Sequence, residues 1–83
     1  MYYVYVIKSS VDNKLYIGST NDLKRRLSEH NAGQNKSTMH RKPLELVYYE
    51  AYRSKLDSLE RERKLKRFNN SYTELKKRIN RSI

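Results

Sequence analysis

The chain has 83 residues, of which 19 are lysine or arginine and 9 are aspartate or glutamate, so its formal net charge is +10. A chain of this length buries about 60% of the surface that its unfolded form exposes, which is enough for one small domain. We therefore expect a single domain over residues 1–83. The chain has no cysteine, which excludes disulfides and thiolate metal sites.

The large positive charge indicates a polyanionic partner, because repulsion among so many cations opposes a compact state unless an anion neutralises them. Nucleic acid is the expected partner, and the alternative is that the lysines only keep the protein soluble. The apolar runs are too short to span a membrane, and no signal peptide is recognisable. We expect no membrane association and a cytoplasmic location.

The first predicted element is a strand over residues 2–7, which are all β-branched or aromatic. Asp12 and Asn13 mark a turn. Residues 14–19 then return as a second strand, so the two strands form an antiparallel hairpin. A turn centred on these two residues pairs Val11 with Lys14.

A helix is predicted to begin at residues 20–22, where a side-chain oxygen can accept from the free amides of the first turn. Gly33 is the expected stop of this helix. Residues 31–42 are polar and lack a period, so they predict an exposed basic loop. A third strand is predicted over residues 44–52, which are dense in strand-forming side chains.

Ser54 and Asp57 are spaced as a capping box that opens a second helix, which we expect to run to about Phe68. Ser71 begins a similar box, and a last helix is expected to run to about Asn80. The order β-β-α-β-α-α predicts an α/β domain, with a small three-stranded, at least partly antiparallel sheet flanked by helices.

Four side chains suited to phosphodiester chemistry lie in the first 30 residues: Tyr5, Tyr16, Arg26 and His30. Arg26 and His30 share the side of the first predicted helix that carries two leucines. We interpret that side as the wall of a cleft, and the alternative is an arginine stem lying on apolar surface. The predicted hairpin places the two tyrosines on one face of the sheet, beside Gly18. We expect the arginine, the histidine and Glu62 to converge over that face.

The second predicted helix has a broad apolar arc made by Leu56, Leu59, Leu65 and Phe68. Glu62 projects into the middle of this arc. Because an unpaired buried carboxylate is costly, Glu62 needs a cation, either an arginine such as Arg26 or a metal ion.

The pair Tyr3-Val4-Tyr5 and Tyr16-Ile17-Gly18 resembles the double signature of the GIY-YIG endonuclease family, although Tyr3 stands where the family usually has glycine. This family includes homing endonucleases, some restriction enzymes and the incision subunit of bacterial nucleotide excision repair. The segment from Ser19 to Asn31 is especially similar to the small stand-alone bacterial members. The resemblance covers essentially the whole chain.

The resemblance implies the same architecture and a metal-dependent endonuclease that hydrolyses phosphodiester bonds, with DNA favoured over RNA. It implies that Glu62 binds Mg²⁺ or Mn²⁺, with Glu60 as second choice. Mg²⁺ suits a lone carboxylate because it keeps several waters and takes oxygen from phosphate. The family often has a further asparagine downstream of the metal-binding glutamate. Asn69 and Asn70 lie nearby but resemble a helix break, so this contact stays unassigned.

The expected mechanism is attack by a water held by Tyr5 or Tyr16, with Arg26 neutralising the developing charge and His30 accepting or relaying a proton. A free tyrosine has a pKa near 10, so we expect cations to lower the pKa of the phenol that acts as base. Six cations of the loop and last helix are candidates for phosphate contacts: Lys36, Arg41, Lys42, Lys76, Lys77 and Arg78. The alternatives are a catalytically silent nucleic-acid-binding module and an interaction domain of a repair complex.

Overall fold

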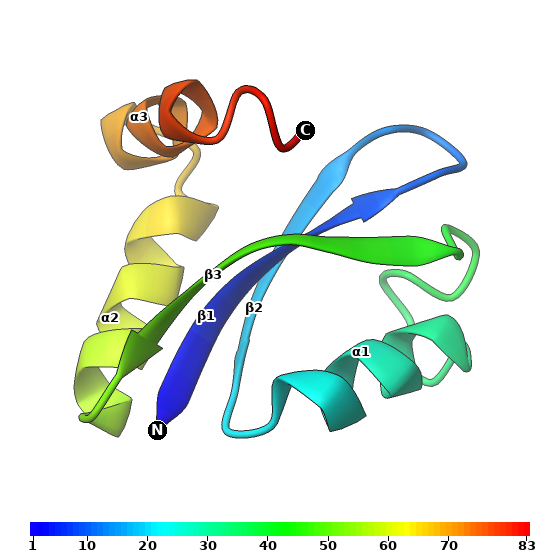
Figure 1. Cartoon of the computed structure of the whole chain (residues 1–83), viewed down its shortest axis with the longest axis horizontal. Helices are drawn as coiled ribbons and strands as arrows, with labels where there is room; N and C mark the ends of the chain where they lie inside the picture. Colours follow the sequence, from blue (N-terminus) through cyan, green and yellow to red (C-terminus); the bar gives the residue numbers. More distant parts are fainter.

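The computed structural model describes all of residues 1–83 and confirms the predicted order of elements. The strands are β1 (Tyr2–Ser9), β2 (Leu15–Thr20) and β3 (Leu44–Tyr52). The helices are α1 (Leu23–Asn31), α2 (Lys55–Lys66) and α3 (Asn70–Arg78). The sheet is antiparallel throughout, with the strand order β2-β1-β3 (Figure 1).

The central strand β1 supplies both halves of the core, because alternate side chains of a strand point to opposite faces. Val4 and Val6 lie in one apolar cluster with residues of α2 and α3. Tyr5 and Ile7 lie in a second cluster, against which residues of α1 pack. The sheet therefore separates α1 from the other two helices.

The hairpin register places the two candidate tyrosines on one face, as expected. Tyr5 pairs with Gly18 and Ile7 pairs with Tyr16. The predicted pairing of Val11 with Lys14 is wrong, because the amide of Ser9 donates to the carbonyl of Lys14 at 3.0 Å instead. The register differs by two residues, which preserves the face of every side chain.

The helix starts follow from capping side chains, and one of them differs from its prediction. Ser54 caps α2 by accepting from the amide of Asp57 at 3.3 Å, as expected. The cap of α3 is Asn69, which accepts from the amide of Ser71 at 3.2 Å, so the predicted cap at Ser71 is wrong. The chain turns earlier than expected because Phe68 adopts a positive φ of 54°.

The broad apolar arc predicted for α2 is also wrong. Leu56 and Phe68 are 76% and 61% exposed, and of the predicted four only Leu65 is buried. Ser58 is the other buried residue of α2. Two buried residues of the chain's last segment, Leu75 and Ile79, complete this side of the core, so α2 contributes only a narrow stripe.

No helix has the length and apolar character that crossing a membrane requires.

Candidate active site

A cavity of about 480 Å³ runs along the edge strand β2 and collects the side chains that the sequence singles out for chemistry. All five line it: Tyr5, Tyr16, Arg26, His30 and Glu62. Consecutive residues of β2 from Leu15 to Ser19 also line it, so the cavity follows the edge and reaches both faces of the sheet. The cavity therefore opens to solvent at the edge of the sheet and does not interrupt the packed core.

The phenol of Tyr5 is the centre of the polar network in this cavity. Its oxygen lies 2.9 Å from Nε2 of His30 and accepts from Nε of Arg26 at 3.3 Å. The terminal Nη1 of Arg26 donates to Glu29 at 3.2 Å. The second terminal nitrogen of Arg26 makes no hydrogen bond within the protein, so it remains free for a ligand.

His30 is held on both sides by protein groups. Its Nδ1 lies 2.7 Å from the hydroxyl of Thr38, and its Nε2 faces Tyr5. Most of residues 31–42 are exposed, as predicted, but Thr38 is an exception and is only 1% exposed. The loop folds back because this buried hydroxyl satisfies the imidazole. Neither nitrogen of His30 is left for a direct contact with a substrate.

Burial dominates the protonation of this pair. Burial raises the pKa of Tyr5 above its ordinary value, and the hydrogen bond from Arg26 offsets only part of that rise. Arg26 thus lowers the pKa of Tyr5, as expected of a neighbouring cation, but burial has the larger effect. Burial and the charge of Arg26 lower the pKa of His30, so the imidazole is neutral at neutral pH. The pair is a neutral phenol beside a neutral imidazole.

Tyr16 is less confined than Tyr5. Its hydroxyl donates to Asp12 at 3.3 Å, and Asp12 in turn pairs with Arg41 at 3.0 Å. The side chain is half-buried, whereas Tyr5 is only 4% exposed. Tyr16 therefore presents its phenol to the cavity with a single protein partner.

Glu62 enters the cavity from α2, on the other side of β2 from α1. Its Oε1 accepts from the hydroxyl of Ser19 at 2.8 Å, and its Oε2 lies 2.8 Å from the ammonium of Lys66. The cation beside Glu62 is thus Lys66, and Arg26 pairs with Glu29 instead. The expectation that Glu62 and Arg26 lie over the same face of the sheet is wrong. They lie on opposite sides of β2, and the cavity joins them around the edge of this strand.

The donor set fits a weakly coordinated hard cation and does not fit a closed metal site. No group of three or more histidine, cysteine, aspartate or glutamate side chains is arranged to hold a metal ion. Glu62 is the single carboxylate of the cavity, and its side chain is 18% exposed. A lone accessible carboxylate suits Mg²⁺ or Mn²⁺ that completes its shell with water and phosphate oxygens. Glu60 points elsewhere and pairs with Lys64 at 3.6 Å.

Gly18 is required by the phenol of Tyr5, which lies directly against it. A methyl group added at Gly18 would overlap the oxygen and ring of Tyr5. We expect Gly18→Ala to displace Tyr5 from His30 and to lower the free energy of unfolding by about 1–3 kcal/mol, which is typical of overpacking. Chemical denaturation measures the loss. An unchanged unfolding midpoint would show that the ring has room to move.

Several residues of the cavity carry no signal in the sequence. Asn35, Ser37 and Thr38 come from the loop before β3, and Lys66 comes from α2. The loop sequence has no periodic pattern of apolar residues that would predict which of its side chains point into the cavity. Neither Asn69 nor Asn70 lines the cavity.

The six cations predicted to contact phosphate lie outside this cavity. Arg41 pairs with Asp12, and Lys77 lies 3.7 Å from Glu74. The ammonium of Lys76 lies 5.5 Å from the ring centre of Tyr72. Lys36, Lys42 and Arg78 form no ion pair. These cations are exposed, and their contact with nucleic acid stays a prediction.

Comparison with known proteins gives a consistent result. The family described as the GIY-YIG catalytic domain matches residues 1–80. A UPF0213 protein of Haloquadratum walsbyi is 43% identical over 77 residues, covering 92% of this chain and 81% of that protein. A UPF0213 protein of Staphylococcus haemolyticus is 43% identical over 68 residues, covering 81% of this chain and 82% of that protein.

A solved structure is also similar. The solution NMR structure of a UPF0213 protein from Bacillus halodurans is 32% identical, with a TM-score of 0.55, and the match covers 90% of this chain and 81% of that one. The family match over nearly the full length, the curated relatives and the shared fold agree, and the chain belongs to the GIY-YIG family.

Proposed function

We propose that this protein is a divalent-metal-dependent endonuclease that hydrolyses phosphodiester bonds, with DNA as the favoured substrate. Membership of the GIY-YIG family supports a nuclease-type function. The observation that carries the proposal is the single cavity in which a free arginine nitrogen, two phenols and one accessible carboxylate meet. A phosphate and a hydrated cation both find partners there.

Arg26 is the residue we assign to the phosphate. Two of its nitrogens are fixed by Tyr5 and Glu29, so the guanidinium is oriented before a substrate arrives. Its remaining donors then face the cavity. A preoriented cation stabilises the charge that develops on the phosphate without a reorganisation cost at the moment of reaction.

Glu62 is the residue we assign to the metal ion. The hydroxyl of Ser19 and the ammonium of Lys66 fix the carboxylate at the cavity wall. A divalent cation held by Glu62 would supply charge stabilisation for the leaving oxygen. Metal binding would break the ion pair between Lys66 and Oε2 of Glu62. The flexible side chain of Lys66 would then allow its ammonium to turn toward the phosphate.

Tyr16 is the phenol we assign to the attacking water. It is half-buried and has one protein partner, so its oxygen retains room for a water. Tyr5 is almost completely buried and bonds two protein groups, which suits a residue that positions Arg26. His30, whose Nε2 lies 2.9 Å from the oxygen of Tyr5, is the residue we assign to relay a proton with this phenol.

The proposal is tested by incubating purified protein with labelled single-stranded, duplex and branched DNA and with RNA, with and without Mg²⁺ or Mn²⁺. Metal-dependent cleavage of one of these substrates is the expected result. Binding without cleavage would identify a silent nucleic-acid-binding module. Failure to bind any nucleic acid would leave the interaction domain as the function.

The exposed cations of the loop and α3 give a separate prediction about affinity. Replacing Arg41, Lys42, Lys76 and Lys77 together by glutamine is expected to flatten the plot of log affinity against log salt. Each lost phosphate contact removes about 0.7–0.9 from the slope, because fewer counterions are released. Fluorescence anisotropy at several salt concentrations measures it. An unchanged slope would show that nucleic acid binds elsewhere on the protein.

A further inference from the structure

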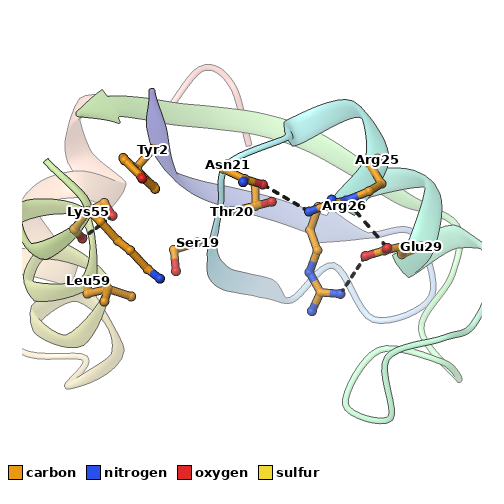
Figure 2. Close-up of a pocket in the computed structure, with 10 residues that line it drawn as sticks. Tyr2, Ser19, Thr20, Asn21, Arg25, Arg26, Glu29, Lys55 and Leu59 are labelled. Atoms are coloured by element: carbon orange, nitrogen blue, oxygen red, sulfur yellow. Dashed lines mark hydrogen bonds and ion pairs between the residues drawn. The ribbon is translucent and has the colours of Figure 1, made fainter. Parts of the chain in front are cut away.

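A second cavity, of about 450 Å³, adjoins the first and shares Ser19 and Arg26 with it. We call it the flanking pocket. It lies between α1 and α2 beside the connection from β2 to α1, and Figure 2 shows its lining residues. We propose that the flanking pocket binds a backbone phosphate of the same nucleic-acid strand, next to the phosphate held at Arg26. This inference rests on the proposed function.

The charge of the flanking pocket favours an anion. Arg25, Arg26 and Lys55 line it, and Glu29 is its one carboxylate. Glu29 lies 3.2 Å from Arg26 and 3.8 Å from Arg25, so it orients both guanidinium groups and leaves an excess of positive charge. An anion in the pocket would relieve the repulsion among these cations.

Lys55 is the cation without a protein partner. Its ammonium takes part in no ion pair or hydrogen bond, in contrast to Arg25, which donates to Asn21 at 3.2 Å. Figure 2 shows the side chain of Lys55 extending from α2 toward Ser19. A flexible ammonium in this position is free to meet a phosphate oxygen.

The lining indicates a phosphate in preference to a base. Only two of the ten lining residues, Tyr2 and Leu59, are hydrophobic. Stacking of a base needs a larger apolar or aromatic surface. The hydroxyl and amide groups of Ser19, Thr20 and Asn21 are of the kind that contact phosphate oxygens and carry no sequence information. The pocket is therefore expected to add affinity without adding sequence preference.

The two connected cavities suggest how a nucleic-acid strand would run over the protein. Arg26 belongs to both cavities, so a phosphate beside it in the first leads directly to the next phosphate of the chain in the second. None of the residues that line the flanking pocket comes from the loop before β3 or from α3. None of them is assigned to the metal ion, so binding in the flanking pocket does not require a metal.

The test uses Lys55→Gln and Arg25→Gln in the full-length protein. Lys55 is the first residue of α2, where a cation opposes the helix dipole, so its loss is not expected to unfold the protein. Lys24→Gln and Lys64→Gln are matched controls, since both residues are exposed, lie on the same two helices and line neither cavity. Circular dichroism confirms that each variant is folded.

Affinity is measured by anisotropy for labelled ten-nucleotide thymidine DNA and uridine RNA in EDTA, over a range of salt. We expect each pocket variant to lower the salt slope by about 0.7, the value for one phosphate contact with a single strand, and each control to leave it unchanged. DNA and RNA are expected to respond alike, because both present the same phosphate.

A scan of neutral methylphosphonate linkages sharpens the result. One linkage is expected to weaken binding to the wild type and to have a smaller effect on Lys55→Gln, because this variant has already lost one of the cations that contact the same phosphate. Unchanged salt slopes in both pocket variants, or no binding of either oligonucleotide by the wild type, would overturn the inference. Binding that follows these expectations without any cleavage in Mg²⁺ would overturn the proposed enzyme and leave the flanking pocket intact.

Discussion

Glu62→Gln is expected to lower the rate of metal-dependent cleavage by about 10²- to 10³-fold, because stabilisation of charge by a metal ion is worth several kcal/mol. The amide keeps the shape of the side chain and its hydrogen bond from Ser19, so the fold is expected to persist. Cleavage is measured in single turnover at saturating protein, over a titration of Mg²⁺. Raising the Mg²⁺ concentration is expected to recover little activity.

Glu60→Gln is the matched control for this prediction. Glu60 is on the same helix, pairs with Lys64 at the surface and lines neither cavity. It should cleave at the wild-type rate. Mn²⁺ adds a readout besides activity, since it should broaden amide resonances near Glu62 in the wild type and in Glu60→Gln only. Wild-type cleavage by folded Glu62→Gln would refute the metal assignment, and a loss confined to Glu60→Gln would transfer it to that residue.

The parts of the fold that the sequence predicts correctly are those set by local chemistry. The aromatic and β-branched residues of β1 favour a strand whatever surrounds them. Ser54 and Gly33 mark helix ends through a hydrogen-bonding side chain and a φ of +78°. Side chains alternate between the two faces of a sheet, so a register error of two residues leaves every side chain on the same face. The prediction that Tyr5 and Tyr16 share a face is therefore correct despite the error in register.

The errors arise where distant segments decide the outcome. The leucines of α2 have a helical period, but Leu65 is the only one of them that is buried, and Leu75 and Ile79 complete the core on this side of the sheet. A single sequence does not show how a core is divided between two helices. Thr38 is similar, since its burial depends on a hydrogen bond to His30 that no local pattern encodes.

The candidate site divides in the same way. Tyr5, Tyr16 and Arg26 are recognisable because they belong to a spaced motif on regular elements. The sequence does not single out Ser19 or Lys55 for a chemical role. They matter because β2 is an edge strand, around which the cavities pass from one face of the sheet to the other. The sequence predicted that all the candidate site residues lie over one face of the sheet. In the structure the cavity joins them around the edge strand β2, from both faces.

Arg26→Ala is expected to lower cleavage by about 10²- to 10³-fold, the usual cost of removing one group that stabilises developing charge. The guanidinium also donates to Tyr5, and this hydrogen bond lowers the pKa of the phenol against the larger effect of burial. Its removal should therefore raise the pKa of Tyr5 further. A titration of ¹³C-labelled tyrosine by NMR measures this shift without any substrate.

Arg26→Lys separates the two roles of the side chain, because lysine keeps the positive charge and loses the fixed fork of donors. We expect this variant to recover only part of the rate, since a flexible ammonium cannot hold Tyr5, Glu29 and a phosphate together as the guanidinium does. Lys24→Ala, an exposed change on the same helix, should cleave as the wild type. If folded Arg26→Ala cleaves at the wild-type rate, the phosphate is neutralised by another cation, and Lys66 is then the candidate because it lines the same cavity beside Glu62.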